Sequence, residues 1–284
     1  MMDNLEQSIN KQRIADSFSK AASTYDSVAA LQRDIGHKVL AALPETFSES
    51  CVVCDLGCGT GYFTELLANK FTQANLTGSA GALAADDQIS RVIALDLAHG
   101  MLTHARQVHD LPSVQWVCGD AEQLPLASKS IHYLFSSLAI QWCQNYPVLF
   151  QEIERVLVSG GEAHIATLGP NTLNELREAW AAVDSFTHVN QFTPLANLQT
   201  ALISVPLLTC EAKVANTVLS YTELKQLTHE LKALGAHNMN AGQSKGLTAP
   251  QRLKAFKNAY EQQRNTEGFL PATYEVYYLT LRKQ

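Results

Sequence analysis

The chain has 284 residues, of which 46% are hydrophobic and 17% are charged, so it is long enough for one large globular domain. Its formal net charge of -6 argues against general nucleic-acid binding, because that function needs a basic surface. The N-terminal segment mixes acids with bases, and no run reaches the roughly 18 apolar residues of a membrane span. We therefore expect a cytoplasmic protein with no membrane partner and no nucleic-acid partner.

Helices and strands follow a simple order in the first 170 residues. Two helices are expected near Ile9–Ala22 and Val28–Leu43. Strands are then expected at Cys51–Leu56, Arg91–Leu95, Val114–Cys118, Ile131–Ser136 and Glu162–Thr167. Helices are expected between them at Tyr62–Lys70, Gly100–Val108 and Tyr146–Leu157. This alternation predicts an α/β fold with a doubly wound, mostly parallel sheet covered on both faces.

The alternation weakens after Thr167, and the small, polar segment Gln73–Gln88 is interpreted as a surface loop inserted before the second strand. Later elements are expected as helices at Leu173–Val183, Tyr221–Leu234 and Gln251–Tyr260 and as strands near Leu207–Val214 and in TYEVYYLTLRK. We interpret the chain as one domain, residues 1–284. Its parts are lid helices in residues 1–45, a core in 46–170, a helical cap with the remaining strands in 171–268 and a closing strand in 269–284.

Two short motifs are assigned no chemistry. Cys51 and Cys54 have an odd separation in the expected strand, which directs their side chains to opposite faces, so we expect buried reduced thiols and no metal site. The segment from Gly242 to Gly246 fits the G-x-S-x-G elbow of α/β-hydrolases. The preceding residues HNMNA are too polar for the buried strand that such an elbow requires, so we interpret this match as coincidence.

Three closely spaced glycines follow the first expected strand, in VVCDLGCGTGYFTELLA. Gly57, Gly59 and Gly61 have the spacing G-x-G-x-G, which differs from the dinucleotide pattern G-x-G-x-x-G. No lysine follows closely enough for a P-loop, so ATP binding by that route is excluded. In an open α/β sheet this loop lies at the ligand-binding edge, although glycines also end strands for purely steric reasons.

Acidic residues mark the ends of three successive expected strands. Asp55 precedes the glycines, Asp96 ends the second strand, and Asp120 follows the third. Asp96 is placed to accept hydrogen bonds from two ribose hydroxyls, and Asp120 to meet an adenine amino group. The structural alternative for each is a turn or a helix N-cap, where Asp is common. Three acids without a basic group to bind a phosphate are suited to a cationic nucleoside that carries no phosphate. S-adenosylmethionine (SAM) is such a ligand.

Four segments resemble the consecutive motifs of the Rossmann-like, class I SAM-dependent methyltransferases. They are DLGCGTGYFTELLA, VIALDLAHGMLTHAR, GDAEQLPLASKSIHYLFSSLAIQW and EIERVLVSGGEAHIATL, between Cys51 and Leu168. The resemblance implies cofactor contacts by Asp55, Gly57, Cys58, Gly59, Gly61, Asp96, Leu97, Met101, Asp120 and Ala121. Asp96 lies 35 residues beyond Gly61, where a dinucleotide fold has about 20, and the inserted loop absorbs the difference.

The rest of the chain resembles a narrower family, the malonyl-acyl-carrier-protein O-methyltransferases of biotin synthesis. The matching stretches are FSKAASTYDSVAALQRDIG, SSLAIQWCQN, HVNQFTP, LKALGAHN and LPATYEVYY. The resemblance implies methylation of the free carboxylate of a malonyl thioester. Such a carboxylate is ionised at neutral pH, so no general base is needed and catalysis reduces to placing the nucleophile.

The same resemblance indicates which side chains place the substrate. Tyr25 is the candidate catalytic residue, and the candidate substrate-binding residues are Gln141, Trp142, His188, Asn190, Phe192 and His237. Core packing is the alternative for Trp142 and Phe192, and an ordinary surface or hydrogen-bonded histidine is the alternative for His188 and His237.

Residues 245–264 carry five bases and one acid, a net charge of +4 in an acidic chain. On charge alone this is a solvated helix face. If the partner is a small acidic carrier protein, Arg252, Lys254 and Lys257 are candidate carrier contacts, with malonyl-CoA as the alternative thioester. Two other functions stay open at this point: methylation of another small carboxylic acid or a quinone-like ring, and cofactor binding without catalysis or with nicotinamide redox chemistry.

Overall fold

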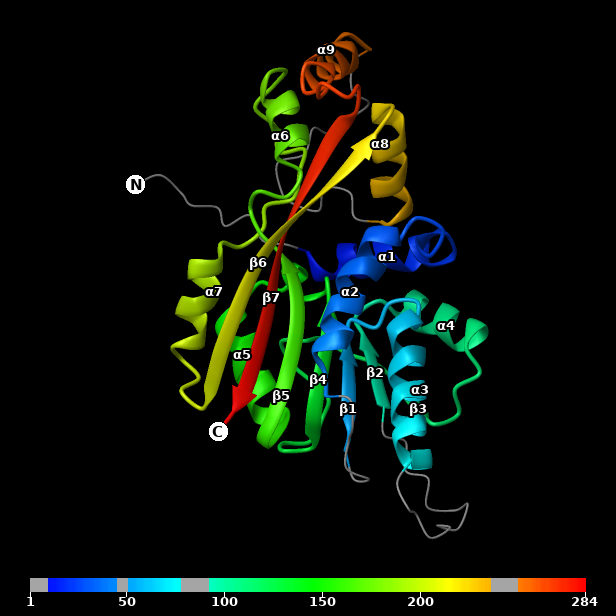
Figure 1. Cartoon of the computed structure of the whole chain (residues 1–284), viewed down its shortest axis with the longest axis vertical. Coiled ribbons are helices and arrows are strands. Elements are labelled where there is room, and N and C mark those ends of the chain that lie inside the picture. The colour runs from blue at the N-terminus through cyan, green and yellow to red at the C-terminus, as the bar shows by residue number, and fades with distance from the viewer. Residues whose placement is uncertain (1–9, 45–50, 78–91, 236–249) are drawn as a thin grey trace.

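One mixed sheet of seven strands organises the part of the chain that the structure describes, in the order β3-β2-β1-β4-β5-β7-β6 (Figure 1). The structure is a computed structural model, and it describes residues 10–44, 51–77, 92–235 and 250–284. The strands are β1 (Val53–Leu56), β2 (Val92–Asp96), β3 (Val114–Cys118), β4 (Ile131–Ser137), β5 (Leu157–Leu168), β6 (Leu208–Tyr221) and β7 (Leu270–Lys283). Strands β1 to β5 pair in parallel, whereas β7 is antiparallel to both β5 and β6. The expected doubly wound, mostly parallel α/β sheet is confirmed.

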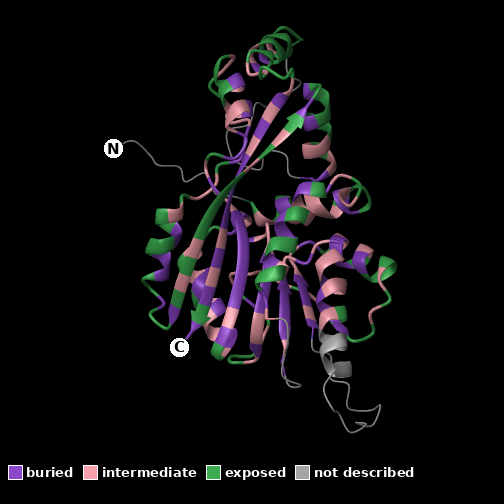
Figure 2. Cartoon of the chain, in the orientation of Figure 1, coloured by how far each residue is buried: buried purple, intermediate pink, exposed green. Residues whose placement is uncertain are grey.

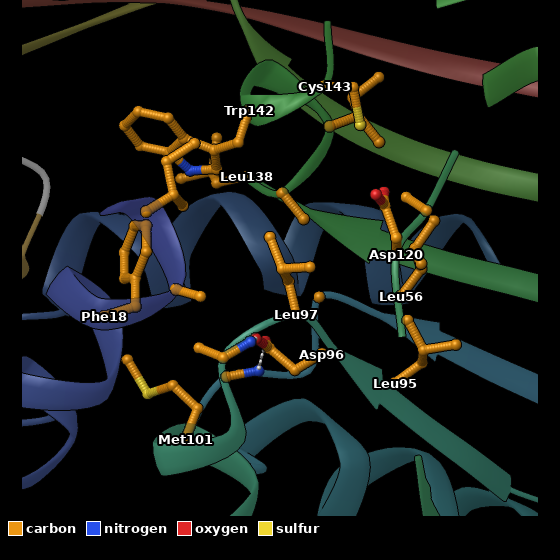
Figure 3. A pocket seen from close by; sticks show the side chains of 18 of the residues that line it. Phe18, Leu56, Leu95, Asp96, Leu97, Met101, Asp120, Leu138, Trp142 and Cys143 are labelled. Atoms are coloured by element: carbon orange, nitrogen blue, oxygen red, sulfur yellow. Dashed lines mark hydrogen bonds between the residues drawn. The ribbon is translucent and has the colours of Figure 1, made fainter. Parts of the chain in front are cut away.

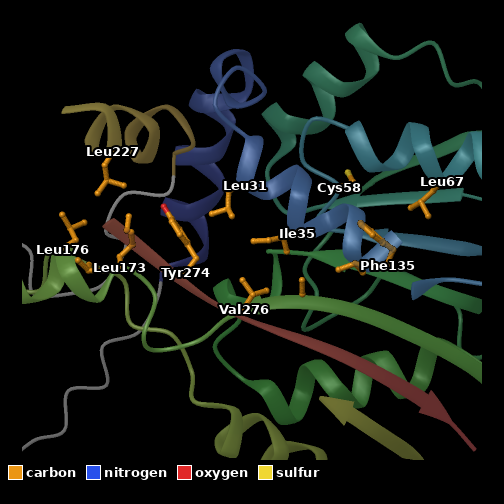
Figure 4. Packing of buried hydrophobic residues seen from close by; sticks show 14 of the residues in the cluster. Leu31, Ile35, Cys58, Leu67, Phe135, Leu173, Leu176, Leu227, Tyr274 and Val276 are labelled. Carbon is orange, nitrogen blue, oxygen red and sulfur yellow. The ribbon is translucent and has the colours of Figure 1, made fainter. Parts of the chain in front are cut away.

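Helices cover both faces of the sheet and form two separate cores. One face carries α2 (Ala30–Ala42), α3 (Tyr62–Thr77) and α4 (His99–Val108), and the other carries α5 (Tyr146–Val156) and α7 (Leu195–Leu202). Phe135 of β4 packs in one core with Ile35 of α2 (Figure 4). Its neighbour Leu134 belongs to the other core, with Leu149 of α5. This division follows from the period of two along a strand, which sends successive side chains to opposite faces.

The remaining helices gather beyond the carboxyl ends of the parallel strands (Figure 1). They are α1 (Lys11–Tyr25), the short 3-10 helix η2 (Ile140–Trp142), α6 (Asn174–Ala181), α8 (Leu224–Ala233) and α9 (Pro250–Glu261). Strands β6 and β7 pair over their whole lengths and extend past the sheet into this group of helices. In Figure 2 the core strands are largely buried, whereas the edge strand β6 alternates toward solvent. The long antiparallel pair therefore connects the sheet to the helices above it.

Several expected boundaries are wrong. The strand expected to end at Val214 continues to Tyr221, because β7 offers β6 a hydrogen-bonded partner at every position, and α8 accordingly begins at Leu224. The loop expected from Gln73 is helical as far as Thr77, since α3 ends only where Gly78 follows. Residues 78–91 lie outside the described part of the chain, as does the G-x-S-x-G segment.

Helices α2 and α3 approach closely where α2 has a glycine. A Cβ atom built at Gly36 would lie 2.1 Å from Cζ of Phe63. The Phe63 ring itself packs on Phe135, with ring centroids 5.2 Å apart. Gly36 is therefore needed for contact between the two helices and not for backbone freedom.

Replacing Gly36 with Ala is expected to lower the free energy of unfolding by about 1–2 kcal/mol, because an overpacking cost of about 2–3 kcal/mol outweighs the roughly 1 kcal/mol that Ala gains in a helix. Urea unfolding measures this change. Combining Gly36→Ala with Phe63→Leu should cost less than the two single changes together. A Gly36→Ala variant as stable as the wild type would contradict the close approach.

Candidate active site

The glycine loop is held tightly against the end of β2. The backbone N–H groups of Gly57 and Cys58 donate to the carbonyl oxygen of Leu95, at 2.7 and 3.0 Å. Gly57, Gly59 and Gly61 have φ values of 77°, 55° and 87°, in the left-handed region that favours glycine. A Cβ atom would lie 2.2 Å from Ala139 at Gly57, but would meet no atom within 4 Å at Gly59. Gly57 is thus required by packing, whereas Gly59 leaves the backbone open to a ligand.

Asp96 fixes the same loop through its carboxylate. Its Oδ2 accepts a hydrogen bond from Gly59 N at 2.8 Å, and its Oδ1 accepts one from Ala98 N at 2.7 Å (Figure 3). Burial raises the pKa of this carboxyl, while the backbone N–H donors oppose the shift. A carboxylate has about four acceptor positions, so two backbone bonds leave capacity for ribose hydroxyls.

Asp120 is bonded to the first helix. Lys11 of α1 donates from Nζ to Asp120 Oδ2 at 2.5 Å and also pairs with Glu122. Burial lowers the pKa of Lys11, but the hydrogen bonds to the two acids outweigh it and raise that pKa above its ordinary value. Glu122 Oε1 in turn accepts from Asn145 N at 2.7 Å, at the start of α5. The lid helix is therefore held to the sheet edge by an ammonium group that stays charged.

Asp55 makes its hydrogen bond to the helix that follows the glycine loop. It is 1% exposed, and its Oδ2 accepts a hydrogen bond from Thr64 Oγ1 of α3 at 2.6 Å. Burial raises its pKa to about 7, although the bond from Thr64 lowers it. Asp55, Cys58 and Gly61 do not line the cavity described next. Their predicted contacts with a cofactor stay predictions.

A cavity at the carboxyl ends of β1 to β4, here called the rim cavity, collects most of the predicted cofactor residues (Figure 3). The predicted residues in its wall are Tyr25, Gly57, Gly59, Asp96, Leu97, Met101, Asp120, Ala121 and Trp142. Residues not singled out from the sequence are Lys11, Phe18, Ser137, Leu138 and Cys143. Ser137 ends β4 and Leu138 follows it, where a ligand edge is expected, but nothing in the sequence places Lys11 beside an acid 109 positions away.

The rim cavity fits a nucleoside with hydroxyl and amino donors. Its polar groups include the acceptors Asp96 and Asp120, and the hydroxyl oxygen of Ser137 is buried there with no hydrogen-bond partner among the described residues. Its one cation, Lys11, is already neutralised by two carboxylates. The wall thus offers hydrogen bonds to a ribose and a base and no free charge for a phosphate.

A second cavity of about 410 Å³, here called the cap cavity, lies between the sheet edge and the helices above it. The predicted substrate residues Gln141, Trp142, His188, Asn190 and Phe192 line it. His237 lies outside the described part of the chain. Four residues line both cavities: Phe18, Tyr25, Leu138 and Trp142. The two cavities therefore meet at this wall, which we call the shared wall.

The shared wall is shaped by a strained residue and an aromatic pair. Leu138 has φ of 54°, unusual for a residue with a side chain, and its carbonyl oxygen accepts a bond from Gln141 Nε2 at 2.6 Å. Gln141 Oε1 also accepts from Thr167 Oγ1 at 3.4 Å, so its amide is engaged within the protein. Trp142 meets Phe18 edge to face, with ring centroids 5.5 Å apart.

Tyr25 is a neutral group in this wall. Burial is the main cause of its raised pKa, and the neighbouring Asp26 and Asp96 raise it further. A phenol with a raised pKa keeps its proton at neutral pH, so Tyr25 is suited to donate a hydrogen bond rather than to remove a proton.

Two of the predicted site residues, His188 and Arg252, make their contacts with other residues of the cap. The His188 ring stacks on Trp180 at 3.8 Å between centroids, and Trp180 stacks on Phe256 at 4.0 Å. His188 Nε2 bonds Asp184 Oδ1 at 2.8 Å, and Arg252 pairs with the other oxygen of Asp184. These contacts join α6 to α9 and give His188 and Arg252 a structural role in the cap.

In the part of the chain that the structure describes, no three His, Cys, Asp or Glu side chains converge on a point where a metal ion would be held. Cys51 and Cys54 are both buried. Among the same residues, no helix is long and apolar enough to cross a membrane.

The sheet order, the glycine loop and the carboxylates at the rim define a class I, Rossmann-like methyltransferase. The methyltransferase domain family matches residues 76–165. The crystal structure of the YcgJ protein from Bacillus subtilis superposes with a TM-score of 0.58 at 15% identity, covering 89% of this chain and 98% of that one, and agrees in fold. Methyltransferases of this class take their methyl group from SAM.

The chain belongs to the family of malonyl-acyl-carrier-protein O-methyltransferases. It is 39% identical, over 95% of its length, to the enzyme of that name from Laribacter hongkongensis, of which it covers 88%. It is 49% identical, over 99% of its length, to the biotin biosynthesis bifunctional protein BioHC of Cellvibrio japonicus, of which it covers 52%. The chain thus spans about half the length of the bifunctional relatives that it matches.

The raised pKa of Asp55 predicts that the protein is less stable at neutral pH than at pH 4. The native state keeps the Asp55 proton that the unfolded state has lost above about pH 4, so this contribution to stability falls as pH rises from about 4 to about 7. Asp55→Asn should remove the effect. The difference in unfolding free energy between pH 4 and pH 8 should shrink by about 4 kcal/mol in the variant, measured by urea unfolding. Equal pH profiles for the two proteins would show that Asp55 is ionised in the native state.

Proposed function

We propose that this chain transfers a methyl group from SAM to the free carboxylate of a malonyl group carried on an acyl carrier protein, in an early step of biotin synthesis. The observation that carries the proposal is the wall shared by the rim cavity and the cap cavity. A cofactor in the first cavity and an acyl group in the second would meet only there. The names of the family members supply the malonyl carrier protein as substrate.

The cofactor residues are proposed from the rim cavity. Bound SAM would supply an electrophilic methyl group on a sulfonium. Asp96 would hold the ribose and Asp120 the adenine, with the open backbone at Gly59 near the methionyl end. Leu97 and Met101 line the same cavity and would flank the adenosine. Adenine binding at Asp120 competes with Lys11, so Lys11 would shift toward Glu122 when the cofactor enters.

The acceptor carboxylate needs to be oriented and shielded from water, and it needs no general base. It is ionised at neutral pH, and water around it would lower its reactivity. The Tyr25 phenol, which keeps its proton, would donate a hydrogen bond to one carboxylate oxygen and leave the other to attack the methyl. Phe18 and Trp142 would exclude water from the same wall. Because the amide of Gln141 is already bonded to Leu138 and Thr167, Gln141 would act by holding the shape of this wall.

Methyl transfer to different malonyl compounds tests this function. Three reactions contain the protein and SAM together with malonyl carrier protein, malonyl-CoA or free malonate. The mass of each product is measured by mass spectrometry. We expect one added methyl group on the carrier substrate and none on free malonate. Methylation of free malonate alone, or of none of the three, would overturn the proposal. S-adenosylhomocysteine should raise the melting temperature and NAD should not, which separates a methyltransferase from a nicotinamide enzyme.

The carrier contact is proposed on two lysines of α9. Lys254 and Lys257 are exposed, and neither pairs with another group among the described residues, whereas Arg252 is paired with Asp184. The neighbouring Leu253 lines the cap cavity, so this face of α9 lies near the acyl site. Free cations there would attract an acidic carrier during encounter.

Reversing both charges, with Lys254→Glu and Lys257→Glu, should raise KM for malonyl carrier protein about tenfold at low salt and leave KM for malonyl-CoA within twofold. Lys213→Glu, on the exposed edge strand β6, is the matched control and should change neither constant. Steady-state kinetics at two ionic strengths measure the effect, which should weaken with added salt. An unchanged KM for the carrier substrate would place the docking surface elsewhere.

A further inference from the structure

Gln32 of α2 presents an unsatisfied polar group beside the acyl site. Its Oε1 is buried and has no hydrogen-bond partner among the described residues. A buried amide oxygen without a partner costs free energy, so such groups are rare unless a water or a ligand completes them. Gln32 lines the cap cavity, which makes a bound substrate the natural source of the missing donor.

Gln32 also lines a third cavity, of about 320 Å³, here called the side cavity. The side cavity lies between the turn from α1 to α2, the end of β6 and helix α8, with Ser27, Ser220 and Glu230 in its wall. Gln32, Leu234 and Tyr274 line both this cavity and the cap cavity. Figure 4 shows Tyr274 rising from β7 between Leu31 of α2 and Leu227 of α8. The two cavities therefore adjoin at these three side chains.

The wall of the side cavity suits a neutral, hydrogen-bonding chain. Glu230 accepts a bond from the Tyr221 hydroxyl at 2.7 Å, and both residues lie in the wall, so a phosphate would be repelled there. Tyr274 is 7% exposed, and burial raises its pKa, so it too is a neutral hydroxyl. Such a wall can take amide groups, which carry one donor and one acceptor each and no charge.

We infer that the side cavity and the cap cavity form the path of the pantetheine arm that carries the malonyl group, and that the side-chain amide of Gln32 hydrogen-bonds an amide of that arm. This inference rests on the proposed function, since it needs a malonyl thioester as substrate. The arm carries two amide groups between its phosphate and its sulfur. With the malonyl carboxylate at the shared wall, the arm leads back past Gln32, and the phosphate stays outside the side cavity.

Two malonyl thioesters, one with the pantetheine arm and one without it, test the role of Gln32. Malonyl-CoA has both arm amides, and the S-ethyl thioester of malonate has none. Gln32→Leu should lower kcat/KM for malonyl-CoA about fivefold, the size of one lost hydrogen bond, and leave kcat/KM for the ethyl thioester within twofold. Gln32→Met, which keeps the length and flexibility of the side chain, should show the same pattern. Gln151→Leu, at an exposed position of α5, is the matched control and should change neither value.

Blocking the side cavity tests the path independently. Ser220 lies in its wall on β6, and Ser220→Trp should lower kcat/KM for malonyl-CoA at least tenfold without changing it for the ethyl thioester. Each variant is first checked for folding by its melting temperature and by its affinity for S-adenosylhomocysteine.

The outcomes separate this inference from the function on which it rests. A wild-type protein that methylates no malonyl thioester would overturn both. A wild-type protein that methylates both thioesters, with Gln32 variants that lower the two kcat/KM values equally or not at all, would overturn only the role of Gln32. Unchanged malonyl-CoA kinetics in Ser220→Trp would show that the arm enters elsewhere, for example past Lys232 and Leu253 of the cap cavity.

Discussion

The hydrogen bonds between the glycine loop and the end of β2 are the constraint on which the rest of the site depends. The carbonyl of Leu95 and the carboxylate of Asp96 together accept from Gly57, Cys58 and Gly59. These bonds hold two neighbouring strand ends in a fixed relation, and the rim cavity opens directly above them (Figure 3). Most of the donors are backbone groups, and the side chains of Asp96, Asp26 and His109 also bond the loop.

The cap depends on a different set of buried hydrogen bonds. Glu275 of β7 is 8% exposed, and its side chain accepts from the backbone and side chain of Asn171, at 3.1 and 2.9 Å. Glu175 of α6 accepts from the backbone of Thr273 at 3.0 Å. Both carboxylates join the segment after β5 to the long strand β7. The cap cavity is therefore built on the same sheet as the rim cavity, and the wall between the two has a defined shape.

Two unsatisfied buried atoms lie at these cavities. Four buried side-chain atoms lack a hydrogen-bond partner among the described residues, and two of them belong to Ser137 in the rim cavity and Gln32 in the cap cavity. The strained backbone of Leu138 lies in the shared wall. Buried polar groups without partners are found where a ligand supplies the missing hydrogen bond, and strained residues are common at ligand sites. Their positions here agree with two adjoining binding sites.

The sequence by itself determined the alternation of elements, the glycine loop and the acids at the strand ends. These features are local, because a period of two or 3.6 residues and a G-x-G-x-G turn depend on near neighbours along the chain. The presence of Asp96 and Asp120 at one rim followed from the rule that parallel strands end at the same edge. The sequence also predicted that Gln141, Trp142, His188, Asn190 and Phe192 serve one site, and all five line one cavity.

Only the tertiary structure decided which groups face the cavities. Asp55 has the same strand-end position as Asp96, yet its carboxyl turns to Thr64 of the next helix, since burial under α3 favours that bond. Lys11 bonds Asp120, which lies far away in the sequence. Gln32 lines two cavities whose walls come from helices and strands distant in the sequence. Such contacts depend on how whole elements pack, and no local pattern of residue types encodes them.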